Sequence, residues 1–344
     1  MNILGITPSN PNTGRTPEEL YLLKLEELGH KVIILENPET IPTGVDVIAA
    51  ISEESYEKAH MLSKIHNIPF YAHMNWIPPW RVFRDDGVNW GLDTVHKQLS
   101  YSEKIALVRM YSTQCFHWMN ADVKSLSAKC FKQLINEFIG KNILSHIIYK
   151  GHDTDKIIKF LDKTELTKRE EITCVAKFVP YNRIHHIIEA LNKIKFKGVL
   201  NLVGSGPEKK LYESIKEDIV INYVDDKYKL ECIARSKVCV VMWDDVVPAE
   251  SLFLDTPCVT YDSPFMKELY SDTLVYAENN NIDDLAEKIS HTLQLKDIDR
   301  NELTSKGVND IEHGKINARS LKYAVNKLEL LLQEAIEKRG MNNE

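Results

Sequence analysis

The chain has 344 residues and a formal net charge of −7. This length predicts about two domains of ordinary size, and the acidic balance argues against nucleic acid as the main partner. No apolar run approaches the roughly 20 residues that a membrane-spanning helix needs. The six cysteines are scattered without a Cys-x-x-Cys pair, which predicts a reducing, cytoplasmic setting and no structural metal.

Short apolar segments alternate with amphipathic patterns along the whole chain. In the first half these segments lie at 2–6, 31–35, 46–51, 69–72, 122–126 and 143–149. The second half begins at Ile172 and continues with segments at 199–203, 219–222, 237–242 and 257–260. This alternation predicts an α/β protein whose parallel sheets are covered by helices on both faces.

A charged stretch at 156–171 separates the two halves and indicates a linker. We therefore expect a first domain at 1–158, a second at 159–316 and a C-terminal helix within 317–344. Two doubly wound domains that face each other bind ligands at the carboxyl ends of their strands.

Three segments of the second half stand out by their order. A Gly-x-Gly-Pro turn at 204–207 follows an apolar strand. Upstream stands Val175-Ala176-Lys177-Phe178-Val179-Pro180-Tyr181-Asn182-Arg183, and downstream stands Pro248-Ala249-Glu250-Ser251-Leu252-Phe253-Leu254-Asp255-Thr256-Pro257-Cys258-Val259. This order resembles the nucleotide-sugar half of the GT-B glycosyltransferases, in particular the retaining, family 4-like group (glycosyl transferases group 1). There the three segments read roughly VGRLVPYKG, VGxGP and EAMACGTPVV.

The first half carries the resemblance as well. Gly14, followed by a helix that ends in Gly29-His30-Lys31-Val32, is similar to the family's opening. Ile68-Pro69-Phe70-Tyr71-Ala72-His73 and Lys150-Gly151-His152-Asp153 resemble two further family segments. The resemblance implies a GT-B fold, with two facing Rossmann-like domains and a C-terminal helix that crosses back to the first.

It also implies an activity, namely that of a retaining, metal-independent hexosyltransferase. Such an enzyme moves a sugar from a nucleoside-diphosphate sugar to an acceptor hydroxyl, which is part of a saccharide or a lipid-linked molecule, and it needs no cofactor besides the donor. Two alternatives stay open on the same fold. One is a catalytically degenerate nucleotide-sugar-binding protein. The other is a nucleotide-sugar epimerase, which relies on a set of acidic residues that we do not find.

The resemblance implies three catalytic residues. Lys177 and Arg183 stabilise the departing diphosphate as fixed cations, and His73 lies near the reacting carbon. The family has arginine at position 177 and lysine at position 182, whereas this chain has Lys177 and Asn182 with Arg183 beside it. The ordinary alternative is that both cations are solvated and that the histidine is structural.

The implied donor site has further members. Glu250 binds the ribose hydroxyls, at the start of a helix whose amides at Ser251 and Leu252 hold phosphate. Tyr223 and Val224 resemble the segment that binds the base, and Gly14 lets the backbone approach the phosphates or the acceptor. Each residue also has a structural reading, as a helix-terminal glutamate, a buried aromatic or a turn glycine.

The family's first glutamate is missing. Its position, eight residues before Glu250, is occupied by Met242, and the intervening loop is shortened. Asp244 or Asp245 is the candidate replacement at the sugar hydroxyls. The alternative is that these two aspartates only form a turn.

The region 74–120 has no counterpart in the family and is rich in tryptophan. Trp76, Trp80, Trp90 and Trp118 lie in it, together with Arg81 and Arg84. Such a set suits a saccharide acceptor, a peripheral contact at the inner membrane face, or a packed aromatic insertion.

Overall fold

The computed structural model describes residues 1–344 except for 8–16, 51, 75–99, 164–168, 180–181, 214–219, 243, 245, 318 and 342–344. Contacts among the described residues divide the chain into two units. The first contains the described parts of Met1–Trp80, Ser100–Gly151 and Leu321–Glu344, and the second contains those of His152–Ser320. We expected the divisions after residues 158 and 316, and the contacts place them after Gly151 and Ser320.

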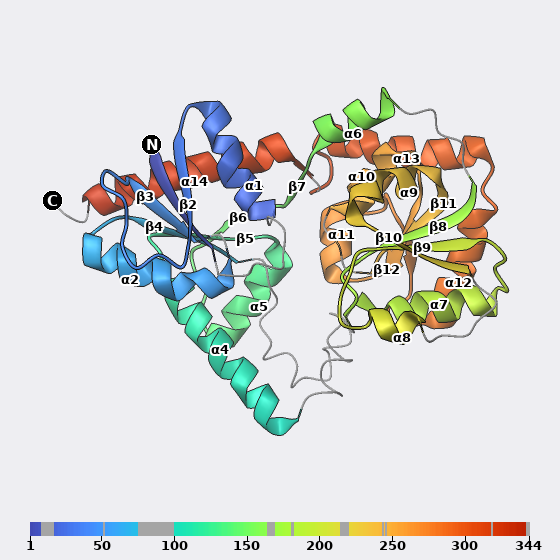
Figure 1. The fold of residues 1–344 in the computed structure, drawn as a ribbon, viewed down its shortest axis with the longest axis horizontal. Coiled ribbons are helices and arrows are strands. Elements are labelled where there is room, and N and C mark those ends of the chain that lie inside the picture. The colour runs from blue at the N-terminus through green and yellow to red at the C-terminus, as the bar shows by residue number, and fades with distance from the viewer. Residues whose placement is uncertain are drawn as a thin grey trace. The chain divides into compact units, whose positions relative to one another are not determined.

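The sheet of the first unit consists of six described strands (Figure 1). In sheet order they are β2 (Lys31–Glu36), β1 (Asn2–Thr7), β3 (Val47–Ala50), β4 (Phe70–Met74), β5 (Val123–Leu126) and β6 (His146–Ile147). All neighbouring pairs are parallel. Parallel neighbours need a crossover, usually a helix, and this explains why helical patterns alternate with apolar segments in the sequence.

Helices cover both faces of this sheet (Figure 1). They are α1 (Pro17–Lys24), α2 (Tyr56–His66), α4 (Tyr101–Met119), α5 (Lys129–Ile139) and α14 (Leu321–Met341). Successive strand residues point to opposite faces. Val47 and Ala49 accordingly pack in one core with α1 and α14, and α2 and α4 contact the same part of the sheet as neighbours of each other.

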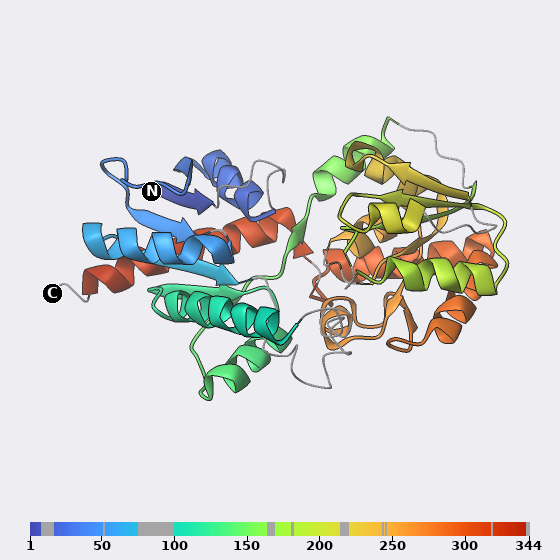
Figure 2. The ribbon, with the colours of Figure 1, turned by 60° about the horizontal axis from the view of Figure 1, so that its bottom comes forward.

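The C-terminal helix α14 packs on the first unit, where it lies beside α1 (red and blue in Figures 1 and 2). Leu328, Leu331 and Leu332 are buried in the core of that unit. Two polar contacts add to this packing, between His30 Nε2 and Glu329 Oε1 at 2.7 Å and between Arg339 and Asp122 at 3.3 Å. The amphipathic pattern at the end of the sequence thus predicted a helix that is present.

The second unit has a sheet of the same kind, again with six described strands. In sheet order they are β10 (Val220–Val224), β9 (Val199–Val203), β8 (Arg169–Val175), β11 (Ser236–Val240), β12 (Cys258–Tyr261) and β13 (Val275–Ala277). The order reverses between β8 and β11, because the chain first builds outward to β10 and then returns past β8. In doubly wound folds such a reversal marks the place where ligands bind.

The helices of the second unit also form two layers (Figure 2). On one face α7 (Ile184–Lys193), α8 (Lys209–Glu213) and α12 (Ile282–Leu293) bury their apolar sides against the sheet. The others are α6 (Thr154–Leu161), α9 (Lys229–Arg235), α10 (Val247–Phe253), α11 (Pro264–Tyr270) and α13 (Asp297–Glu312). Gly307 of α13 packs against Leu252 of α10, and a Cβ at residue 307 would lie 2.7 Å from the leucine side chain. A side chain at this position would therefore require the Leu252 side chain to move.

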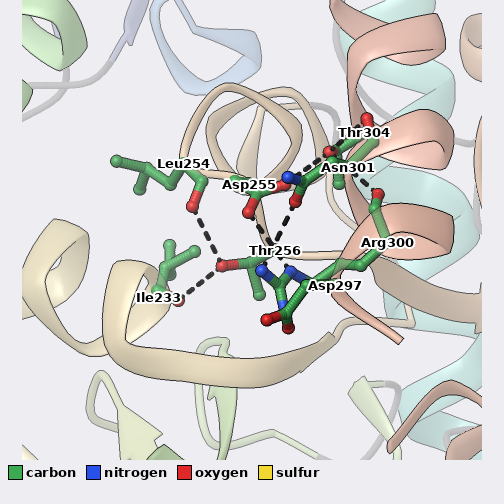
Figure 3. Close-up of polar contacts among 8 residues, drawn as sticks. All are labelled: Ile233, Leu254, Asp255, Thr256, Asp297, Arg300, Asn301 and Thr304. Atoms are coloured by element: carbon green, nitrogen blue, oxygen red, sulfur yellow. Dashed lines mark hydrogen bonds and ion pairs between the residues drawn. The ribbon is translucent and has the colours of Figure 1, made fainter. Parts of the chain in front are cut away.

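Asp255 lies two residues after the last residue of helix α10, in the left-handed backbone region with φ +53°. Aspartate adopts this conformation more readily than most residues because its short side chain bonds locally. Here the carboxylate accepts hydrogen bonds from Arg300 Nε at 3.2 Å and from Thr304 Oγ1 at 2.7 Å, both on α13 (Figure 3). The turn before β12 is thereby tied to a helix that lies far away in the sequence.

Two expectations about individual elements need correction, and one helix was not predicted. The region 74–120 contains that helix, the 19-residue α4, which begins with a capping box at Ser100 and Glu103. Trp118 is fully buried in that helix, which agrees with the packed aromatic insertion for this residue. The segment 143–149 contributes only the two-residue strand β6, and α10 begins at Val247 rather than at Glu250.

Candidate functional site

The strands β8, β9, β10 and β11 are parallel neighbours and end at the same edge of the second sheet. Lys177 follows β8, the turn at 204–207 follows β9, and Tyr223 and Val224 end β10. Asp244 and helix α10 follow β11. The second-unit segments that the sequence singled out therefore meet at one carboxyl edge, beside the reversal of strand order.

Backbone hydrogen bonds join the first two segments directly. Phe178 N–H donates to Ser205 O at 2.8 Å, and Glu208 N–H donates to Phe178 O at 3.0 Å. The glycines allow this approach, because a Cβ at Gly204 would lie 2.1 Å from Ala176 O and a Cβ at Gly206 would lie 2.5 Å from Phe178 O. Both glycines also have positive φ angles. Their role in the structure is close packing of two backbone segments.

Lys177 and Arg183, the two cations predicted to bind the diphosphate, differ in their exposure to solvent. Lys177 is exposed at the carboxyl edge, and its backbone carbonyl accepts a hydrogen bond from Asn182 Nδ2 at 2.8 Å. Arg183 is 0% exposed. It occupies the left-handed region with φ +48°, donates to Asn279 Oδ1 at 3.1 Å, and lies 5.6 Å from the Tyr261 ring centroid. The structure thus leaves Lys177 exposed to solvent and turns Arg183 inward.

Glu250 lies in the first turns of α10 and is largely buried. Its Oε1 accepts from the Lys229 ammonium at 2.8 Å. Its Oε2 is buried and has no hydrogen-bond partner among the described residues. A buried carboxylate oxygen without a donor is costly, and this oxygen is therefore a candidate acceptor for a hydrogen bond from outside the described residues.

The N-terminus of α10 is already occupied. Asp244 Oδ1 accepts from the amides of Val246 at 2.7 Å and Val247 at 2.6 Å. The amide of Ala249 donates to Tyr270 Oη at 3.3 Å, and Pro248 has no amide hydrogen. Asp244 therefore bonds the backbone of the turn that leads into α10, which agrees with the turn-forming alternative for this residue.

The predicted phosphate contacts at Ser251 and Leu252 need correction for the same reason. Because α10 starts at Val247, the amides of these two residues lie inside the helix and not at its free end. Ser251 is fully buried and its hydroxyl donates to Pro248 O at 3.1 Å. The Leu252 side chain packs on α13.

Tyr223, predicted to lie at the base, is half-buried at the end of β10. Its ring contacts Phe178 with centroids 6.2 Å apart, and Lys209 Nζ lies 5.4 Å from its centroid. Val224 O accepts from Gly204 N–H at 3.3 Å and so joins β10 to the glycine turn. The segment predicted to bind the base therefore contacts both the glycine turn and the segment that contains Phe178.

His73 is the next-to-last residue of β4 in the first unit and is 6% exposed. Its Nδ1 lies 2.7 Å from Ser125 Oγ, which in turn lies 2.6 Å from the Tyr71 hydroxyl. Tyr56 donates to the backbone carbonyl of His73. These contacts hold the imidazole at the carboxyl edge of the first sheet.

Some predicted residues lie outside the described part of the chain, namely Gly14, Asp245, Trp76, Trp80, Trp90, Arg81 and Arg84. Two contacts that the sequence did not reveal are those of Ser125 with His73 and of Lys229 with Glu250. The two residues of these contacts are 52 and 21 positions apart in the sequence, and therefore no local sequence pattern indicates either contact.

Within the described residues, no group of three or more histidine, cysteine, aspartate or glutamate side chains is arranged to hold a metal ion. None of the described helices is both long and apolar enough to cross a membrane.

Comparison with known proteins agrees with this geometry. Residues 155–309 match the family model of "Glycosyl transferases group 1". No curated protein sequence matches the chain significantly.

Solved structures show the same fold across nearly the whole chain. Anabaena Alr3699/HepE, solved in complex with UDP-glucose, superimposes with a TM-score of 0.71 at 13% identity, covering 97% of this chain and 99% of that one. Sucrose-phosphate synthase from Thermosynechococcus elongatus gives a TM-score of 0.70 at 13% identity, with 98% and 99% covered. The trehalose 6-phosphate synthase of Burkholderia multivorans gives 0.62 at 11% identity, with 98% and 99% covered.

The expected α/β architecture with parallel sheets in two Rossmann-like units is therefore confirmed as a GT-B fold. The match of residues 155–309 to this family model indicates a glycosyltransferase.

Proposed function

We propose that this protein is a retaining, metal-independent hexosyltransferase of the family 4-like group. It transfers a sugar from a nucleoside-diphosphate sugar to the hydroxyl of a saccharide or a lipid-linked acceptor, in the cytoplasm or at the inner membrane face. The observation that carries the proposal is the carboxyl edge of the second sheet. There the exposed Lys177 follows β8, and Glu250 follows the neighbouring β11 with one carboxylate oxygen that has no partner among the described residues.

The residue roles follow from charge and exposure. Lys177 is the accessible cation and stabilises the charge that the diphosphate gathers as it departs. Arg183 would have to break its contacts with Asn279 and Tyr261 to reach the diphosphate. We therefore propose Lys177 as the main diphosphate contact. Glu250 accepts from the ribose, and Tyr223 with Val224 lines the base. His73 stabilises charge developing on the sugar.

In the proposed reaction the bond between the anomeric carbon and the diphosphate oxygen breaks. A new bond to the acceptor oxygen forms on the same face, and the acceptor proton passes to the departing phosphate. Fixed cations supply the electrostatic stabilisation that a metal supplies in other transferases. This is the basis for proposing metal independence.

The test combines binding with turnover. Purified protein is screened by thermal shift against UDP-, GDP-, ADP- and dTDP-sugars, with magnesium and with EDTA, because a ligand that binds the folded state raises its melting temperature. The donor that binds is then assayed for transfer to candidate acceptors, and NMR of the product reports the anomeric configuration. We expect one nucleotide class to bind and react in EDTA, with the anomeric configuration retained.

Two variants locate the site, and one serves as a control. Lys177→Ala and Glu250→Ala are expected to weaken donor binding about tenfold or more, since each removes a charged contact. Lys306→Ala removes an exposed lysine of α13 and is expected to bind normally. Full binding and turnover in both site variants would refute the assignment. Donor binding without any transfer or hydrolysis would favour a degenerate binding protein.

A further inference from the structure

Lys229 and Glu250 form an ion pair that joins two segments of the proposed donor site. Lys229 is the first residue of α9, which follows β10 and its Tyr223 and Val224 after a short 3-10 turn at 226–228. Glu250 belongs to α10. Their 2.8 Å contact therefore connects the segment expected at the base with the carboxylate expected at the ribose.

The pair is shielded from solvent. The side chains of Lys229 and Glu250 are 19% and 11% exposed. Burying a charged pair gains little for folding relative to apolar packing, because desolvation offsets the attraction. Apolar side chains at these two positions would stabilise the fold equally well. We therefore explain the ion pair by a contact with a ligand.

The two oxygens of the Glu250 carboxylate have different surroundings. Oε1 is held by the ammonium of Lys229, and Oε2 is buried without a hydrogen-bond donor among the described residues. The ammonium thus fixes the rotation of the carboxylate and leaves a single accepting oxygen in a defined direction. It also offsets the negative charge that would otherwise repel a nearby diphosphate.

We propose that Lys229 is a positioning residue that makes the donor site selective for ribonucleotides over deoxyribonucleotides. It holds Glu250 so that Oε2 accepts from one ribose hydroxyl. A nucleotide that lacks this hydroxyl leaves the buried oxygen unpaired, and a site built to bind a hydroxyl discriminates strongly against such an analogue. This inference rests on the proposed function, because it requires a nucleotide at this edge.

The experiment measures the binding of UDP, GDP and ADP by calorimetry, each beside its 2′-deoxy and 3′-deoxy forms, to the full chain. The variants are Lys229→Met, which removes the charge, and Lys229→Arg, which keeps it. Lys227→Met is the matched control, since Lys227 is exposed, lies two residues away, and sits over the Tyr228 ring rather than against Glu250. Lys229→Ala, which likewise leaves Glu250 without this donor and favours the helix, replaces Lys229→Met if that variant does not fold.

The wild type is expected to bind the ribonucleotide about tenfold or more tightly than one of its deoxy forms. Lys229→Met should reduce this ratio to about twofold, whereas Lys229→Arg and Lys227→Met should keep it. A ratio unchanged in Lys229→Met, or an equal loss of affinity for all forms, would overturn the role of Lys229. Nucleotide binding by the wild type without discrimination would overturn it too, while leaving the proposed function intact. No binding of any nucleoside diphosphate would overturn both.

Discussion

The imidazole Nδ1 of His73 lies 2.7 Å from the hydroxyl oxygen of Ser125, on the neighbouring strand of the first sheet. Ser125 Oγ is also 2.6 Å from the hydroxyl of Tyr71. The backbone carbonyl of Ser125 accepts from Trp118 Nε1 at 3.3 Å. A chain of hydroxyl groups therefore sets the ring orientation of His73 and the nitrogen that it presents at the edge of the sheet.

Removing the Ser125 hydroxyl tests this chain. Ser125→Ala is expected to lower the rate of sugar transfer about five- to tenfold, because the ring loses one hydrogen bond that orients it. Nucleotide affinity should stay the same, since the proposed nucleotide contacts lie in the second unit. Steady-state kinetics beside calorimetry with UDP-sugars measure the two effects. Ser112→Ala, which alters an exposed position of α4, is the control, and an equal rate in both variants would contradict the prediction.

The glycine turn after β9 should tolerate no side chain. Gly206→Ala places a Cβ 2.5 Å from Phe178 O, at a residue with φ +157°. We expect the free energy of unfolding to fall by about 3 kcal/mol, because backbone atoms must move and the bonds between the turn and Phe178 weaken. Urea denaturation measures this change. Gly340→Ala is the matched control, since a Cβ there meets nothing within 4 Å and alanine favours the helix.

His152 should make the stability depend on pH. Burial lowers the pKa of His152 to about 4, its exposure is 2%, and its ring packs against Phe253. The folded state thus binds this proton less readily than the unfolded state, whose pKa is near 6.5. Stability is full above about pH 6.5 and falls by up to about 3 kcal/mol as the pH drops toward 4.

Replacing the imidazole checks the sign of this effect. His152→Phe is expected to flatten the decline of the unfolding free energy between pH 6.5 and 4, as measured by urea denaturation at several pH values. His66→Gln, at an exposed position of α2, should leave the decline unchanged. A wild-type protein that became more stable as the pH fell through this range would show that the sign is wrong.

The turn at Asp255 offers a prediction about stability in the second unit. Asp255→Ala is expected to cost about 2 kcal/mol, because the bonds to Arg300 and Thr304 are lost and alanine disfavours the left-handed region. Asp255→Gly should cost less than Asp255→Ala, since glycine adopts φ +53° freely. Asp272→Ala, which alters an exposed aspartate, is the control. Equal losses in the alanine and glycine variants would show that backbone strain plays no part.

Much of the fold could be predicted because its signals are local. An apolar strand followed by a helical pattern identifies each βα step by itself, and the glycine turn at 204–207 joins a strand to a helix within a few residues. Helix α4 escaped prediction because apolar side chains such as Met110 and Phe116 remain exposed in it, so that its periodicity is unclear. The start of α10 was misplaced because the role of Asp244 in the turn that leads into α10 was not recognised.

The sequence by itself determined the class of the fold, the order of the motif segments and the residue types that they carry. Only the tertiary structure decided which of those side chains are exposed and which are buried or paired. It turned Arg183 inward against Asn279, left Lys177 exposed, and paired Glu250 with Lys229. The physical reason is that strands and turns form from neighbouring residues, whereas the exposure and partners of a side chain depend on packing between segments that lie far apart in the chain.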